Sequence, residues 1–171
     1  MLKCIFIYVK AMLFYAPCRN DFLCIVLCAL SMLFYLFLLD KIMISRTNYS
    51  SGSKWEDLIG YSRAVRVGDV VEVTGTVACD ADGKVVGVND AYLQTKFIYE
   101  KMEKVLKQAG AEMKHVVRVR MFVTDIKRWE EFGKGHAEFF SVIKPCLTMI
   151  EVSRFIEPEL LVEIEASAII C

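Results

Sequence analysis

Two carboxylates near the end of the chain are the residues whose type and spacing could do chemistry. Glu163 and Glu165 alternate with apolar residues, so an extended strand would place both carboxylates on one side and the apolar residues on the other. The apolar residues are Val162, Ile164, Ala166 and Ala168. A carboxylate in this setting can transfer protons. On most strands the same pattern is only a solvated face, so both interpretations stay open.

A second segment carries two cations at the same spacing. Arg118 and Arg120 alternate with apolar residues between positions 116 and 123, so a strand would place both guanidinium groups on one face. His136 differs, because it lies on an apolar helical stripe between Phe132 and Phe140. A buried histidine with a hydrogen-bond partner is the simpler interpretation there, and a catalytic base is the alternative.

The segments that must position these residues alternate between strand and helix patterns from Trp55 onward. A long apolar stripe predicts a helix that Asn89 or Asp90 begins and Gly110 ends. The residues of the stripe are Leu93, Phe97, Ile98, Met102, Val105, Leu106 and Ala109. A second helix follows over 127–141 and is expected to turn Trp129, Phe132, His136, Phe139 and Phe140 towards the core. Strands are predicted at 63–67, 70–77, 116–124, 147–153 and 160–170. This order predicts an α+β domain in which two helices cover one face of a mixed sheet.

The first 42 residues form a hydrophobic extension. Residues 22–39 contain no charge, and as a helix they would extend about 27 Å, close to the roughly 30 Å of a bilayer core. A membrane anchor is one interpretation. The others are an inessential extension, with a natural start near Met43, and a cleaved targeting peptide. The first would anchor the protein to a membrane, and a start near Met43 would make it cytoplasmic.

We therefore divide the chain into the extension 1–42, a polar linker 43–54 and a folded domain 55–171. Residues 43–171 carry 17 basic and 19 acidic side chains, which gives no basic excess for nucleic acid. The cysteines of this part are Cys79, Cys146 and Cys171. They are widely spaced, and no Cys-x-x-Cys pair or histidine cluster occurs. We therefore expect no disulfide framework, no metal site and no cofactor.

Several motifs, in this order and spacing, resemble the Rid (YjgF-like) family. They are the opening Gly60-Tyr61-Ser62, the segment 117–125, the segment 145–152 and the alternating segment 162–168. The resemblance covers about residues 55–170. It implies a YjgF-like, chorismate-mutase-like fold. It also implies a homotrimer whose three sheets line a central interior and whose ligand clefts lie between neighbouring subunits.

The resemblance also implies an activity, because the best-studied members of the family hydrolyse reactive enamines and imines. Matched position by position, Glu163 falls on the glutamate that hydrogen-bonds the catalytic water. Tyr61 falls on a cleft tyrosine, and Thr74 and Gly75 fall on the Ser/Thr–Gly pair of the pocket. These are the residues to which the family assigns substrate binding and catalysis. Without the family match, Tyr61 would be an interface or core aromatic residue.

Leu147 departs from the family pattern. In deaminating members this position holds an arginine, whose planar guanidinium pairs with the substrate carboxylate. Leu147 cannot make that contact, so Arg120 is our candidate for a replacement cation. Two functions follow: a hydrolase (deaminase) of enamines or imines with a non-standard substrate, or a non-catalytic trimeric small-molecule-binding or regulatory protein.

Overall fold

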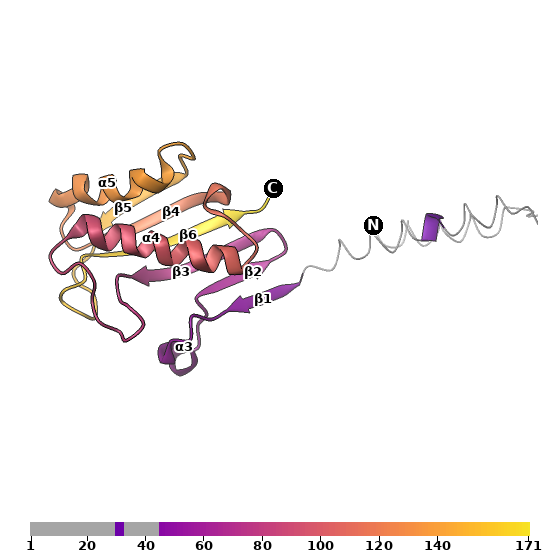
Figure 1. Ribbon diagram of the computed structural model, residues 1–171, viewed down its shortest axis with the longest axis horizontal. Coiled ribbons are helices and arrows are strands. Elements are labelled where there is room, and N and C mark those ends of the chain that lie inside the picture. The colour runs from indigo at the N-terminus through magenta and orange to yellow at the C-terminus, as the bar shows by residue number, and fades with distance from the viewer. Residues whose placement is uncertain (1–29, 33–44) are drawn as a thin grey trace, which may run out of the picture. The chain divides into compact units, whose positions relative to one another are not determined.

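A six-stranded mixed sheet is the centre of the fold, in a computed structural model that describes residues 30–32 and 45–171 (Figure 1). Residues 1–44 and 45–171 are separate units, and only the second is described in detail here. The strands are β1 (Arg46–Tyr49), β2 (Ala64–Val67), β3 (Val70–Val77), β4 (Val116–Val123), β5 (Cys146–Glu151) and β6 (Val162–Ile169). They lie in the order β1-β2-β3-β6-β4-β5, and all neighbours are antiparallel except the parallel pair β4–β5.

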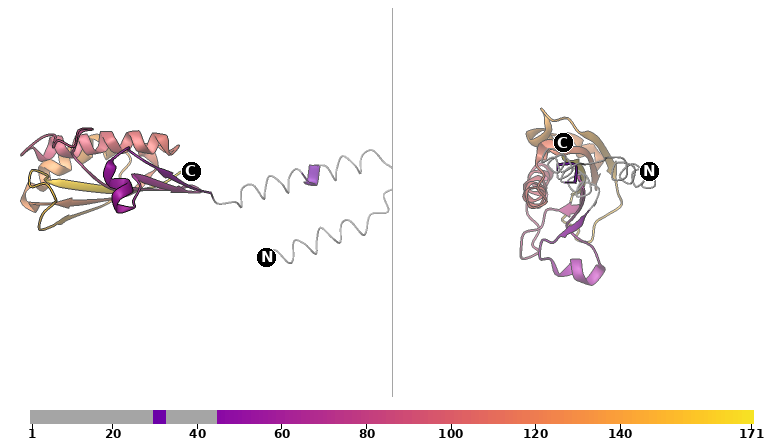
Figure 2. Two further views of the ribbon diagram at one scale, coloured as in Figure 1. Left: turned by 90° about the horizontal axis from the view of Figure 1, so that it is seen from below. Right: turned by 90° about the vertical axis from the view of Figure 1, so that its right-hand side faces the viewer.

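Helices α4 (Ala91–Gln108) and α5 (Trp129–Phe140) cover one face of this sheet (Figure 2). Asp90 begins α4 by accepting a hydrogen bond from Leu93 N at 2.8 Å, and Gly110 follows its end with φ of 76°. A short helix, α3 (Lys54–Ile59), and two 3-10 turns at Met113–His115 and Ile126–Arg128 complete the described elements. The predicted α+β fold, with two helices on one face of a mixed sheet, is therefore confirmed.

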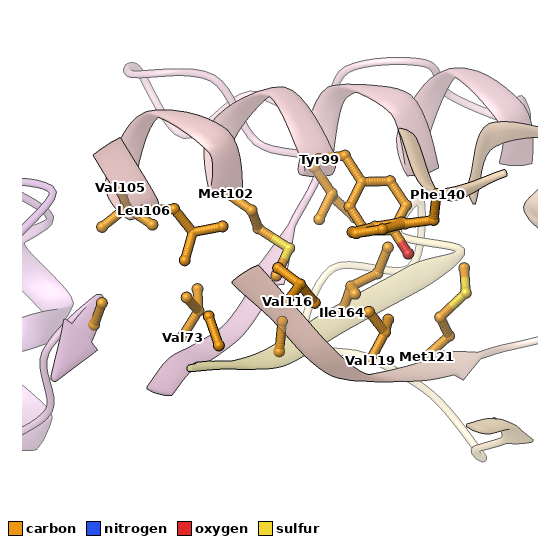
Figure 3. Close-up of a cluster of buried hydrophobic side chains, with 14 of the residues drawn as sticks. Val73, Tyr99, Met102, Val105, Leu106, Val116, Val119, Met121, Phe140 and Ile164 are labelled. Carbon is orange, nitrogen blue, oxygen red and sulfur yellow. The ribbon is translucent and has the colours of Figure 1, made fainter. Parts of the chain in front are cut away.

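The hydrophobic core lies between the sheet and α4 (Figure 3). Alternate residues of β3, β4 and β6 point to the helices, so these strands are apolar on one side. Buried examples are Val73, Val119, Met121 and Ile164 from the strands and Tyr99, Met102 and Leu106 from α4. The remaining alternate residues form what we call the open face of the sheet. Charged side chains alternate onto it: Glu72, Arg118, Arg120, Glu163 and Glu165.

Three local expectations differ from the structure. The segment 43–54, expected as a linker, contains strand β1, which pairs with β2. Trp129 is expected in the core but is 57% exposed, because it begins α5 at the surface. Leu93 is also 45% exposed, whereas Tyr99, absent from the predicted apolar stripe, is fully buried.

The prediction of a membrane-spanning helix is corrected. Among residues 30–32 and 45–171, no helix is long and apolar enough to cross a membrane. Residues 22–29 and 33–39 of the predicted span lie outside the described residues.

Candidate functional site

The open face is hollowed over β1, β2, β3, β6 and β4. The concavity has a volume of about 370 Å³. Of the residues singled out in the sequence, Tyr61, Thr74, Arg118, Arg120 and Glu165 line it. Gly75 and Glu163 do not line it, although they belong to β3 and β6, which both contribute lining residues. The structure therefore divides the predicted site into two parts.

Tyr61 reaches the concavity because α3 ends abruptly at Gly60. Gly60 adopts φ of 85°, a left-handed conformation that suits glycine, and both its N–H and that of Tyr61 donate to Glu56 O, at 2.9 and 3.0 Å. The chain then turns into β2. The ring of Tyr61 lies 5.8 Å from the Arg63 guanidinium carbon. A left-handed C-cap thus fixes the position of the predicted cleft tyrosine.

Thr74 and Gly75 lie in a β-bulge. Val73 pairs with Ala166 and Thr76 pairs with Ile164, so Thr74 and Gly75 lie between these two pairs, where β6 supplies a single residue. A bulge bends the strand and changes the direction of its side chains. It accounts for the adjacent Thr74 and Gly75 lying in different parts of the site.

Glu163 lies directly over Gly75. A Cβ added to Gly75 would lie 1.9 Å from Glu163 Oε1 and 2.9 Å from its carboxyl carbon, so the carboxylate occupies the space that any other residue at position 75 would fill. This contact gives a physical reason for a glycine before Thr76. It also ties two family positions, Gly75 and Glu163, to one another.

Burial is the main electrostatic influence on Glu163. The side chain is half-buried, and this burial raises the pKa of the carboxyl above its ordinary value, as does the negative charge of Glu165. The positive charge of Arg63 acts in the opposite direction, but the net shift is upward. A carboxyl with a raised pKa holds a proton more readily than an ordinary carboxylate, as a general acid–base residue must.

Arg63 is a neighbour of this carboxyl that the sequence did not single out. Its Nη1 donates to Gly75 O at 3.0 Å and to Thr76 Oγ1 at 3.4 Å, and its Nε is 3.8 Å from the carboxylate of the buried Glu56. The Nε hydrogen has no hydrogen-bond partner among the described residues. The position of Arg63 directly after the Gly60-Tyr61-Ser62 motif is the sequence feature that could have identified it as part of the site.

The predicted replacement cation, Arg120, is already paired. Its Nε lies 2.6 Å from Glu165 Oε1 on the facing strand. Its neighbour Arg118 lines the same concavity, and no described residue forms a hydrogen bond or ion pair with it. The two arginines therefore share a strand face but differ in their electrostatic surroundings.

Leu147 is not part of the concavity. It pairs with Val119 across the parallel β4–β5 contact, and residues in register share a face. Val119 is fully buried beneath the helices, so Leu147 lies on the helix side of the edge strand, 42% exposed. Within one chain the structure does not bring Leu147 to Glu163.

His136 has a structural partner. Its Nδ1 is 2.7 Å from the hydroxyl of the buried Tyr99, and its ring stacks on Phe140 at 4.8 Å between centroids. Burial lowers the pKa of His136. These contacts favour the interpretation of a core histidine. Among the described residues, no group of three or more His, Cys, Asp or Glu side chains is placed to hold a metal ion.

The fold and these contacts define a class of α+β protein, in which a helix-covered mixed sheet presents a charged, hollowed face. The family model described as Endoribonuclease L-PSP matches residues 53–170, and the chain belongs to this family, which is the Rid or YjgF-like family. The resemblance deduced from the motifs is confirmed.

Relatives of known sequence and structure agree with this assignment. The chain is 34% identical over 118 residues to an uncharacterized protein of Streptomyces coelicolor, covering 69% of this chain and 87% of that protein. It is 32% identical over 108 residues to a RutC family protein of Pyrococcus abyssi, covering 63% and 84%. A crystal structure of a YjgF/YER057c/UK114 family member from Mycobacterium tuberculosis is similar at 47% identity and a TM-score of 0.67, over 74% of this chain and all of that one.

Proposed function

We propose that the protein hydrolyses the C=N bond of small imines or enamines, with Glu163 as its acid–base residue. The observation that carries this proposal is the setting of Glu163. Its carboxyl is half-buried, has a raised pKa, and lies in the space left by Gly75 with Arg63 nearby. The arrangement combines a proton-exchanging group with a fixed position, as general acid–base catalysis requires.

The chemistry assigned to Glu163 is proton transfer. As a carboxylate it takes a proton from a water molecule while the water oxygen bonds to the imine carbon. The C=N double bond becomes a single bond, and its nitrogen receives a proton. The resulting carbinolamine loses ammonia, which leaves a carbonyl compound. Each proton that Glu163 accepts is returned to the leaving nitrogen, so the carboxylate is regenerated.

The substrate that this site favours is one without a carboxylate beside the imine. Leu147 has no charge to offer, and Arg120 is paired with Glu165. A charged hydrogen bond contributes roughly 1.5–3 kcal/mol, so its loss weakens short 2-imino acids by about ten- to a hundredfold. We include in the proposal a homotrimer, in which a second copy completes the site around Glu163.

The test is ammonia release from freshly generated imines, with and without a carboxylate, by the purified full chain. We expect faster release from the uncharged imines, and Glu163→Gln should reduce kcat/KM by a factor of 100 or more, in the range of about 10²–10⁴ expected for loss of an acid–base group. Glu138→Gln, on the outer helix α5, is the matched control and should keep its activity.

The second candidate is a non-catalytic small-molecule-binding protein. The observation that favours it is the division of the site, since the concavity contains Tyr61, Thr74 and Arg120 but not Glu163. In that case no imine is hydrolysed faster than in buffer, and Glu163→Gln leaves ligand binding unchanged. The absence of any hydrolysis above the rate in buffer would reject the hydrolase.

A further inference from the structure

Among the described residues, Glu56 is the only charged residue that is buried, with 4% of it exposed. A buried carboxylate is costly without partners, so its contacts indicate what it does. Its Oε1 accepts hydrogen bonds from Ser51 N at 3.1 Å and Ser51 Oγ at 2.6 Å, and lies 3.8 Å from Arg63 Nε. Burial raises the pKa of Glu56, but hydrogen bonds from Ser50 and Ser51 and the charge of Arg63 lower it overall. The charged form is therefore favoured.

Arg63 connects this carboxylate to the β-bulge of β3. Its backbone carbonyl accepts a hydrogen bond from Thr74 N at 3.1 Å. Its Nη1 donates to Gly75 O at 3.0 Å and to Thr76 Oγ1 at 3.4 Å. A bulge interrupts the regular ladder of the sheet, so its backbone groups need other partners. Arg63 supplies a partner to each of the two bulge residues.

The carboxyl of Glu163 lies against the backbone that Arg63 holds. A Cβ added to Gly75 would lie 1.9 Å from Glu163 Oε1, so the carboxyl packs directly on this glycine. Among the described residues, no hydrogen bond or ion pair joins Arg63 to Glu163, so the guanidinium acts on the carboxyl through its charge. A series of contacts thus runs from Glu56 through Arg63 and Gly75 to Glu163.

The other charged groups around this series come from α4 and β6. Lys101 on α4 repels Arg63, whereas Glu56 on α3 attracts it. Glu165 on β6 repels Glu163, which Arg63 attracts. The arginine that β4 adds to this face is already paired with Glu165. Glu56 is therefore the buried carboxylate that compensates the charge of Arg63.

We propose that Glu56 and Arg63 form a positioning pair for Glu163. Glu56 holds the guanidinium and offsets part of its charge, and Arg63 holds the backbone on which the Glu163 carboxyl lies. Both act through other groups and not on the reacting atoms. The pair lies inside one chain, with the Arg63 side chain only 15% exposed, so it requires no free surface. This inference rests on the proposed hydrolysis, because it concerns the same carboxyl.

The two members of the pair should move the titration of Glu163 in opposite directions. Arg63→Gln removes a positive charge beside the carboxylate, so the titration midpoint should rise by about 0.5 pH unit or more. Glu56→Gln leaves the charge of Arg63 uncompensated, so the midpoint should fall. A pair that only stabilised the fold would lower stability in both variants without opposite shifts.

The test is a carbon-13 NMR titration of the full chain labelled at its glutamate carboxyl groups, with the Glu163 signal assigned by its loss in Glu163→Gln. The same variants are assayed for ammonia release from an uncharged imine as a function of pH. Glu163 must be charged to accept a proton from water, so the acid limb of kcat/KM should follow the NMR midpoint. If no imine is hydrolysed, the proposed function fails, and the NMR titration still decides whether the pair acts on Glu163.

Arg128→Gln and Glu131→Gln are the matched controls, because these residues form an exposed ion pair of the same two types at 2.6 Å. Both should leave the Glu163 midpoint within about 0.2 pH unit, since salt screens exposed charges. Arg63→Lys keeps the positive charge and should restore the natural midpoint.

Removing one partner of a buried ion pair is strongly destabilising, so circular dichroism checks the fold of each variant. The double variant Glu56→Gln/Arg63→Gln leaves no unpaired buried charge and replaces a single variant that does not fold. Its midpoint should lie above the natural one, because Arg63 acts on Glu163 directly. Shifts of the same sign in the two single variants, or an unchanged midpoint in the double variant, would overturn the proposal.

Discussion

At the residue scale, the absence of a side chain at Gly75 leaves the space that the carboxyl of Glu163, the proposed acid–base group, occupies. A side chain at position 75 has to displace the Glu163 carboxyl, because its Cβ would lie 1.9 Å from Oε1. We predict that Gly75→Ala lowers the rate of imine hydrolysis by at least tenfold and leaves the melting temperature within a few degrees of the natural value. The flexible end of Glu163 can move aside, so the fold is expected to survive. Unchanged activity would show that the position of the carboxyl is not important.

The raised pKa of Glu163 leads to a prediction about stability. Because the folded protein favours the neutral carboxyl, the stability associated with this group is fully present below the ordinary pKa of glutamate and is lost as pH rises through the folded pKa. Glu163→Gln replaces the carboxyl by a neutral group of similar shape. Thermal denaturation should therefore show the variant more stable than the natural protein at about pH 8, with the difference shrinking towards about pH 4. If the variant were less stable than the natural protein at the higher pH, burial of the charged Glu163 carboxylate would not be destabilising, which would contradict the prediction.

Individual residues show where sequence reasoning succeeds. Asp90 and Gly110 bound α4 as expected, since capping depends on local chain geometry. Tyr99 was missed because its burial depends on α5, whose His136 and Phe140 surround its ring. Arg120 is the candidate from the sequence for a replacement cation, but its pairing with Glu165 depends on the register of β4 against β6, which no local pattern contains.

At the element scale, α4 and α5 approach each other closely at Gly135. A Cβ on Gly135 would lie 2.8 Å from Thr95 Cβ and 3.2 Å from Tyr92 O, neither of which can yield easily. We predict that Gly135→Ala destabilises the protein by about 1–3 kcal/mol, the usual cost of overpacking. Gly133, on the same helix, has no neighbour within 4 Å of an added Cβ.

Gly133 serves as the control for Gly135, because it lies on the same helix but has room for a Cβ. Gly133→Ala should be stabilising by about 0.5–1 kcal/mol, because alanine is the better helix former. Both variants can be measured by urea denaturation. Effects of the same sign and size at 133 and 135 would mean that the helix contact is looser than the distances indicate.

The β-bulge in β3 is a feature of the strand that the sequence did not predict. The motif Thr74-Gly75 could be located in the sequence, but the irregular pairing that separates the two residues could not. Likewise, the parallel pairing of β5 with β4 decides that Leu147 lies on the helix side. The sequence therefore predicted the elements well and the composition of the site only in part.

At the scale of the whole molecule, the domain should fold without the N-terminal extension. All strands of the sheet and both covering helices lie within residues 45–171, and the family match covers 53–170. We predict that a chain beginning at Met43 is expressed in folded form and unfolds in one cooperative transition. Calorimetry would check this, and a product without a cooperative transition would contradict it.

The last prediction concerns assembly. Strand β5 is an edge of the sheet, and it exposes Leu147 by 42% and Ile150 by 46%. Exposed edge strands with apolar side chains are normally covered in native proteins. We predict that the protein sediments as a trimer, with three times the 19.5 kDa mass of one chain, and that this edge contributes to the contact.

Ile150→Glu should then shift the protein towards the monomer, because it would bury an unpaired charge at the contact. Ile156→Glu is the matched control, since Ile156 is 95% exposed outside the strands and should not affect assembly. Analytical ultracentrifugation at micromolar concentration separates the outcomes. If the natural protein is a stable monomer, or if both variants dissociate equally, the site around Glu163 is not completed by a second copy through this edge.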